Sequence, residues 1–158
     1  MSRQLVFVRH GEAEAGGVRT ADRERALTGN GRAQAQAAGS LLARSGVVCD
    51  HVLCSTAVRA RQTLELALPQ MARTPVVDYD SSLYGAAPET VLELVSVVPA
   101  DVTTLAVVGH NPAMAQLVAA FTGNGGPVAF APASVAVATV DQDWLYVTPE
   151  AGTAQILG

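Results

Sequence analysis

The chain has 158 residues and a mass of 16.3 kDa, and its 49% of hydrophobic and 15% of charged residues exclude a charge-rich disordered protein and predict one globular domain, 1–158. All ten basic residues are arginines, which excludes chemistry that needs a lysine, such as a Schiff base or a P-loop. A net charge of −4 and a pI near 5.2 argue against sequence-independent binding of nucleic acid.

The first half of the chain alternates between apolar runs and amphipathic stretches. Residues 5–8 form a continuous apolar run, typical of a strand buried on both faces, and a polar loop follows them. Residues 28–44 predict a helix, because Thr28 is a suitable N-cap. Residues 51–54 predict the second strand, and apolar residues on one helical face predict a helix over 60–68.

The second half continues this alternation of strands and helices. Residues 76–77 predict a weak third strand and residues 78–87 a loop, after which Pro88 begins a helix. Residues 105–108 predict a fourth buried strand, which is followed by a helix opened by Pro112.

The last part of the chain predicts antiparallel strands. Val135, Val137 and Thr139 alternate with small residues, and a turn at 141–143 leads into 144–147, which is typical of a β-hairpin. All elements together predict an α/β fold: a three-layer α/β/α sandwich with a mostly parallel central sheet and the antiparallel hairpin at one edge. Turn residues interrupt the apolar segments well short of the ~20 residues of a membrane span, so no membrane partner is expected.

Polar side chains follow three of the predicted strands. In open α/β sheets, ligands bind beyond the carboxyl ends of the strands. The first strand delivers Arg9 and His10, the second delivers Ser55 and, one helical turn later, Arg59, and the fourth delivers His110 just before a helix. Because guanidinium groups match phosphate oxygens and a helix N-terminus attracts anions, these residues predict a site for a phosphoryl group.

Four motifs carry a resemblance to a known family. They are Arg9-His10-Gly11, Leu27-Thr28-x-x-Gly31, Ser55-x-x-x-Arg59-Ala60-x-Gln62-Thr63 and Gly109-His110-Asn111-Pro112. In this order they resemble the histidine phosphatase superfamily, and the short length and residues 83–89 are similar to its SixA-type phosphohistidine phosphatase branch. The resemblance covers essentially the whole chain. Thr56 departs from it, since many members have proline after the serine, and this affects the turn more than the chemistry.

The resemblance implies roles for individual residues. The implied catalytic residues are His10 as the nucleophile and Arg9, Arg59 and His110 as the phosphate pocket, and the implied substrate-binding residues are Gly11, Arg25, Ser55 and Glu89. Attack requires a neutral imidazole, and we expect the nearby arginines to hold the pKa of His10 below ~6.5. No metal and no cofactor are expected, because arginine can stabilise the charge on the transferred phosphoryl group.

The leaving group separates the possible substrates. An alkoxide needs a proton from a general acid, whereas phosphohistidine releases an imidazole, a far better leaving group. Glu89 is either such an acid or a favourable charge at a helix start, and Glu12 and Glu14 are within reach of the pocket mouth. The preferred hypothesis is a phosphatase acting on phosphohistidine in a protein. The alternatives are a phosphomonoesterase for a small metabolite and a catalytically silent phosphate-binding module, and the short chain disfavours a mutase.

The remaining candidate residues suggest no further chemistry. His51 is interpreted as a structural histidine, and Cys49 and Cys54 as reduced thiols in the core, without the spacing of a zinc site. No apolar signal-peptide core follows Met1, so a cytoplasmic location is expected.

Overall fold

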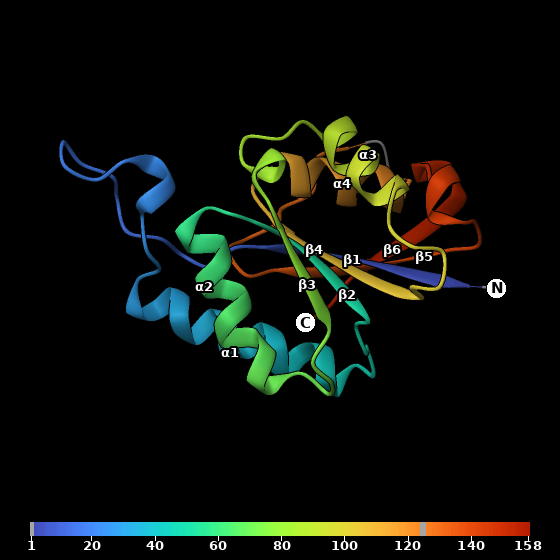
Figure 1. The fold of residues 1–158 in the computed structure, drawn as a ribbon, viewed down its shortest axis with the longest axis horizontal. Helices are drawn as coiled ribbons and strands as arrows, with labels where there is room; N and C mark the ends of the chain where they lie inside the picture. Colours follow the sequence, from blue (N-terminus) through green and yellow to red (C-terminus); the bar gives the residue numbers. More distant parts are fainter. Residues whose placement is uncertain (1, 124–125) are drawn as a thin grey trace.

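The computed structural model describes residues 2–123 and 126–158. The protein folds into a six-stranded sheet with helices on both faces (Figure 1). The strands are β1 (Arg3–Arg9), β2 (His51–Ser55), β3 (Val76–Asp80), β4 (Thr104–Gly109), β5 (Val135–Val140) and β6 (Gly152–Ile156). The helices are α1 (Gly29–Arg44), α2 (Val58–Ala67), α3 (Pro88–Ser96) and α4 (Ala113–Thr122). The strand order is β3-β2-β4-β1-β5-β6, with β1 to β4 parallel and β5 and β6 antiparallel to their neighbours. The predicted three-layer α/β/α class is confirmed.

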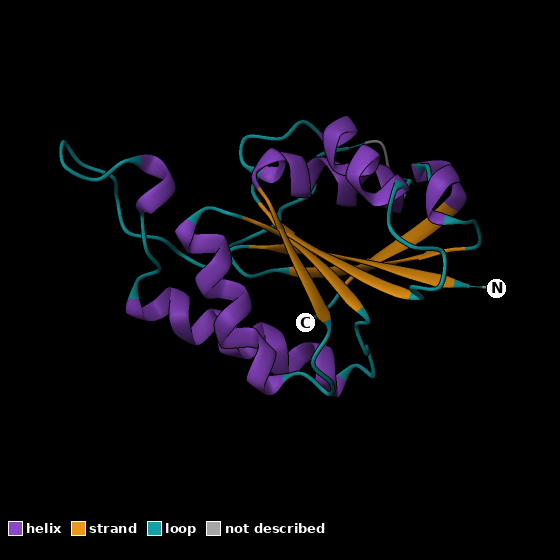
Figure 2. Cartoon of the chain, viewed as in Figure 1, coloured by secondary structure: helices purple, strands orange, loops and turns teal. Residues whose placement is uncertain are grey.

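The core has two halves, one on each face of the sheet. In β1, Leu5 and Phe7 belong to the cluster that includes α3 and α4, whereas Val6 and Val8 belong to the cluster that includes α1 and α2. Figure 2 shows these two helix pairs on opposite sides of the strands. Alternate side chains of a strand point to opposite faces, so a strand covered on both faces must be apolar throughout. This explains the continuous apolar runs of the central strands.

The backbones of helices α1 and α2 approach each other closely. Thr28 caps α1 as predicted, since its Oγ1 accepts a hydrogen bond from the N–H of Gly31 at 2.9 Å. Further along α1, a Cβ on Gly39 would lie 2.2 Å from the carbonyl oxygen of Ala67. Only glycine therefore permits this helix contact without a shift of the backbone.

Two sequence predictions at the sheet edges were wrong. Residues 78–80 belong to β3 and not to a loop, and they are polar because this edge strand is largely exposed. Residues 144–147 do not form the second strand of the hairpin: Trp144 begins a 3-10 helix, and β6 pairs with β5 instead. Trp144 is buried and its Nε1 donates to the carbonyl of Val102 at 2.8 Å, so this segment closes one end of the core.

Other expectations concern thiols and apolar segments. Cys49 and Cys54 are free and buried, and burial raises the pKa of each thiol to about 12.

In the described ranges 2–123 and 126–158, none of the helices is both long and apolar enough to cross a membrane. Residues 124 and 125 of the turn that interrupts the apolar segment after α4 lie outside the described residues.

Candidate active site

The two histidines predicted to share a site lie side by side. His10 follows β1 and His110 follows β4, and these strands are parallel neighbours with Arg9 opposite Gly109. The ring centroids of the two histidines are 5.1 Å apart. Arg59 reaches the same place from the first turn of α2, because β2 is the other neighbour of β4. The carboxyl ends of the parallel strands thus bring together residues up to 100 positions apart.

The surroundings of His10 fix its tautomer and its charge. Its Nδ1 lies 2.8 Å from the carbonyl oxygen of Gly11, and because a carbonyl only accepts, Nδ1 carries the proton and Nε2 keeps its lone pair. The pKa of His10 is lowered to about 4, mainly by burial and further by the charges of Arg59, Arg9 and Arg25. The arginines therefore act in the predicted direction, but burial is the larger cause. His10 is neutral at pH 7.

His110 is held by the hydroxyl of Ser55. Its Nε2 lies 2.8 Å from Ser55 Oγ, and the same Oγ accepts the N–H of Ala57 at 3.3 Å. The Ser55 hydroxyl can donate its proton to Nε2, and in that tautomer the imidazole proton of His110 lies on Nδ1. Burial, followed by the charges of His10 and Arg59, lowers the pKa of His110 to about 4. This Nδ1 is buried and has no hydrogen-bond partner among the described residues.

Two arginines of the site also have unused donors. Arg9 donates from Nη1 to the carbonyl of Phe130 at 3.1 Å, but the Nε of Arg9 and the Nε of Arg59 are buried without a partner in the described part of the chain. Buried polar groups are normally paired, so unpaired donors require an explanation. The Nε of Arg3, at the other end of β1, and the Nε of Arg25, which pairs with Asp22 by charge without hydrogen-bond geometry, have the same property, so the feature alone does not define a site. What distinguishes the site is that three such donors accompany His10.

Asp22, which was not among the predicted site residues, binds Arg59. The Nη1 of Arg59 donates to the backbone carbonyl of Asp22 at 2.7 Å, and Nη2 donates to its Oδ2 at 3.1 Å. Arg25 Nε lies 3.1 Å from Asp22 Oδ1, and the hydroxyl of Tyr84 donates to Oδ2. Tyr84 also places its ring edge-on to His110 at 5.7 Å. The i, i+3 spacing of Asp22 and Arg25 is the one local signal for this cluster.

The loop after β1 is fixed to α2 and to the start of α1. The N–H of Gly11 donates to Thr63 Oγ1 at 2.9 Å, and the hydroxyl of Thr63 donates to the carbonyl of Arg59 at 2.7 Å. A Cβ on Gly11 would lie 2.7 Å from the carbonyl oxygen of Gly31. Gly11 thus allows the close approach that holds the preceding His10 in place.

Comparisons with known proteins agree with this geometry. Residues 5–82 match the model of the histidine phosphatase superfamily (branch 1). The chain is 40% identical over 148 residues to the uncharacterized protein Rv1276c of Mycobacterium tuberculosis, covering 87% of this chain and 89% of that protein. The structure of a candidate phosphohistidine phosphatase SixA from Nakamurella multipartitia superposes with a TM-score of 0.82 and 33% identity, covering 100% of this chain and 96% of that one. The chain belongs to the histidine phosphatase superfamily.

The superfamily match, together with the SixA-type structural neighbour, identifies the protein as a phosphatase. The fold itself is shared more widely: mycobacterial glucosyl-3-phosphoglycerate phosphatase Rv2419c has a TM-score of 0.67 at 18% identity, covering 99% of this chain and 97% of that one. A likeness at this identity concerns the fold alone, so the substrate must be argued from the site residues.

The predicted carboxylates of this histidine phosphatase lie in different surroundings. Glu12 accepts hydrogen bonds from Thr28 Oγ1 at 2.9 Å and from Asn30 Nδ2 at 3.4 Å, so it is engaged at the start of α1. Glu14 is exposed, and its backbone N–H donates to the carbonyl of Ala26. Glu89 is exposed in the first turn of α3, and within the described residues its side chain forms no hydrogen bond or ion pair with a site residue. The geometry therefore ties Glu12 to a helix start and leaves Glu89 outside the cluster.

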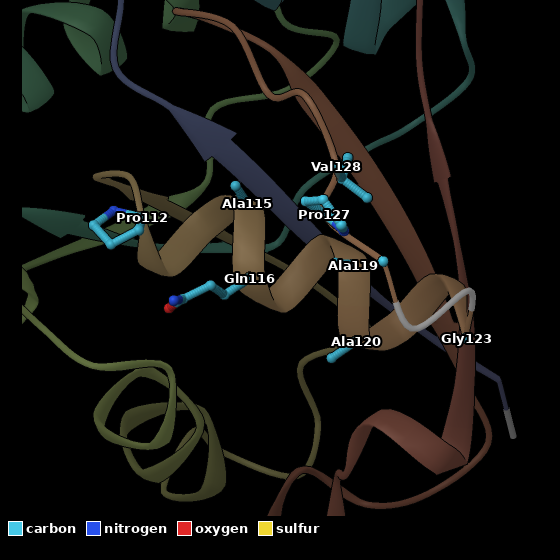
Figure 3. A pocket seen from close by; sticks show the side chains of 9 residues that line it. Pro112, Ala115, Gln116, Ala119, Ala120, Gly123, Pro127 and Val128 are labelled. Carbon is cyan, nitrogen blue, oxygen red and sulfur yellow. The ribbon is translucent and has the colours of Figure 1, made fainter.

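The outer face of α4 carries an apolar groove of about 510 Å³ (Figure 3). It begins at Pro112, continues past Gln116 and Ala120, and is closed by Pro127 and Val128. No charged side chain lines it among the described residues, so this groove is not a site for a phosphoryl group. The described residues also contain no group of three His, Cys, Asp or Glu side chains placed to hold a metal ion.

Proposed function

We propose that this phosphatase removes phosphate from phosphohistidine in a protein and that His10 carries the phosphoryl group between the two half-reactions. The observation that carries the substrate class is the state of the site carboxylates. Asp22 and Glu12, the carboxylates bonded within or beside the described cluster, are both engaged by hydrogen-bond donors, so neither stands ready to protonate a leaving group. An imidazole leaving group does not need one.

The first step follows from the tautomer of His10. Its Nε2 lone pair attacks the phosphorus of a phosphohistidine whose other ring nitrogen carries a proton; the P–N bond breaks with its electron pair, a neutral imidazole leaves, and a phosphohistidine forms on His10. The Nδ1–H group keeps its hydrogen bond to the carbonyl of Gly11, so the ring that gains the phosphoryl group keeps its orientation. In the second step a water oxygen attacks the same phosphorus, the bond from phosphorus to Nε2 breaks with its electron pair and leaves His10 neutral, and the protons of the water depart with inorganic phosphate.

The donors around His10 stabilise the charge of the transferred group. Arg9 and Arg59 offer buried Nε–H groups without partners among the described residues, and His110 offers Nδ1–H once Ser55 donates to its Nε2. In a loose transition state the negative charge lies on the equatorial phosphoryl oxygens, where fixed donors act most strongly. The same donors serve both steps, because the phosphoryl oxygens are similarly placed in each.

Asp22 is unsuitable as a general acid. The hydrogen bond from Tyr84, followed by that from Arg59, lowers the pKa of its carboxyl group below the ordinary value. It therefore carries no proton near neutral pH, where an alkoxide would need one. This supports a substrate whose leaving group departs without help from the protein.

The experiment is a substrate panel at pH 7. We expect wild type to release phosphate from a phosphohistidine-bearing protein with a higher kcat/KM than from alkyl phosphates. Quenching during turnover should trap acid-labile phosphate on His10. The His10→Ala variant should lose both activities, whereas the matched His51→Gln variant, which changes a histidine bonded to Asp78 at the other end of β2, should retain them.

Three results would contradict the proposal. A wild type that hydrolyses alkyl phosphates much faster than phosphohistidine would make the protein a metabolite phosphatase. Activity that survives in His10→Ala would exclude the nucleophile. Phosphate binding without turnover of any substrate would leave a silent binding module.

A further inference from the structure

Asp22 engages one edge of the Arg59 guanidinium. A guanidinium has five N–H groups, which form one fork at its end, between Nη1 and Nη2, and another along its side, between Nε and one Nη. Asp22 accepts from both terminal nitrogens, through its backbone carbonyl at 2.7 Å and its Oδ2 at 3.1 Å. Among the described residues, no other group accepts a hydrogen bond from this side chain. Asp22 therefore occupies the fork at the end of the Arg59 guanidinium.

The side fork of Arg59 is left available. Its Nε is buried and has no partner in the described ranges of the chain, and the side chain as a whole is 7% exposed. A planar group with one edge fixed can rotate little about its own axis. Asp22 thus determines the direction in which the unused Nε–H edge points.

Asp22 is itself held from two further sides. Tyr84 donates its hydroxyl to the same Oδ2 that binds Arg59, and Arg25 approaches the other carboxylate oxygen at 3.1 Å. Arg23 stacks over the ring of Tyr84 at 4.7 Å and donates to Thr56 Oγ1 at 3.3 Å. These contacts fasten the segment that carries Asp22, which extends beyond α1 and α2 at one end of the molecule (Figure 1), onto the catalytic end of the sheet.

We propose that Asp22 is a positioning residue that orients Arg59, so that its Nε edge faces the phosphoryl group in the transition state. This inference rests on the proposed function of Arg59 as a phosphate ligand. Asp22 acts through Arg59 and does not touch the reacting atoms. Tyr84 completes the unit by donating its hydroxyl to the same carboxylate oxygen, Oδ2.

The opposite hypothesis is that Asp22 is a resident anion that competes with the substrate for Arg59. Electrostatics separates the two, because removal of a negative charge from an arginine site should by itself tighten the binding of phosphate. A competitor predicts higher activity when Asp22 is neutralised. A positioning residue predicts a lower kcat with KM unchanged or lower, since the lost interaction is one that matters in the transition state.

The test uses the full chain and p-nitrophenyl phosphate, whose hydrolysis does not depend on the physiological substrate. We expect Asp22→Ala to lower kcat by about 10- to 100-fold, the range for a lost hydrogen bond to a charged group. Both variants keep the bond to the backbone carbonyl of residue 22, but Asp22→Asn also keeps a side-chain acceptor oxygen, so its loss should be smaller. Glu24→Gln is the matched control: it removes a carboxylate from the same 3-10 turn and should leave kcat unchanged.

A double-mutant cycle shows whether Asp22 acts through Arg59. In the Arg59→Ala background, Asp22→Ala should cost less than about threefold, because the group that it orients is gone. Where turnover of the double variant is too slow to measure, inhibition constants of orthovanadate provide the same cycle. Equal losses in both backgrounds, or a gain in kcat for Asp22→Ala, would overturn the proposal. An Arg59→Ala variant with wild-type activity would instead refute the proposed function of Arg59.

Discussion

Lowering the pH from 8 to 5 should destabilise the protein through its two buried site histidines. The pKa values of His10 and His110 are about 4 in the folded chain, chiefly because burial penalises the charged ring, whereas an exposed imidazole has a pKa of ~6.5. Between these values the unfolded chain binds protons that the folded chain does not. The contribution to the free energy of unfolding is therefore complete above pH ~6.5 and is lost as the pH falls toward 4.

The magnitude follows from the two pKa values. For one histidine whose pKa is ~6.5 unfolded and about 4 folded, the free energy of unfolding at pH 5 is about 2 kcal/mol lower than at pH 8. The charge of His10 also lowers the pKa of His110, so the two losses are coupled and need not add. Replacing His10 should remove on the order of 2 kcal/mol of pH dependence.

Urea denaturation at pH 8 and pH 5 measures this difference for wild type and His10→Gln. The difference between the two proteins reports His10 and its coupling to His110, because the carboxylates that titrate at lower pH are the same in both. The chain has three histidines, so an NMR titration of His51→Gln follows the two site imidazoles alone. A pH dependence that is the same in wild type and His10→Gln, or a folded-state midpoint of His10 at pH 6 or above, would refute the reasoning.

Three further predictions test the pocket, the acid and the helix packing. Arg59→Lys keeps the charge but loses the fork, so kcat/KM should fall by on the order of 10²-fold, whereas Arg61→Lys on the exposed side of α2 should have little effect. Glu89→Gln should leave phosphohistidine hydrolysis within about tenfold of wild type, because general acid catalysis contributes ~10²–10⁴-fold where it is used; a larger loss would identify Glu89 as the acid. Gly39→Ala should lower the free energy of unfolding by about 1–3 kcal/mol, while Gly29→Ala, whose added Cβ has no neighbour within 4 Å, should not; equal effects on urea midpoints would contradict the packing argument.

The central strands could be predicted from the sequence because their burial is uniform. β1, β2 and β4 are covered on both faces, so each appears as a continuous apolar run that stops where the chain reaches the site. The order of alternating strands and helices then requires that their carboxyl ends lie at one edge. This is why His10, Arg59 and His110 could be assigned to one site from the order of the motifs.

The edge strands could not be predicted in the same way. β3 and β6 have exposed positions, and their residue types overlap with those of loops. Whether Trp144 continues a strand or fills the end of the core depends on the space beside Val102, which lies 42 residues away. Local patterns do not contain that information.

Within the site, the sequence by itself determined which groups are present, and the tertiary structure decided how they are used. The order of the motifs along the chain indicated which histidines and arginines belong to the site. The neutral state of His10 depends mainly on its burial, and its tautomer on the orientation of the Gly11 carbonyl. Asp22 meets Arg59 and Tyr84 across 37 and 62 residues of chain, and hydrogen bonds over such separations leave no periodic signal in the sequence. The fold alone therefore revealed the carboxylate that holds Arg59.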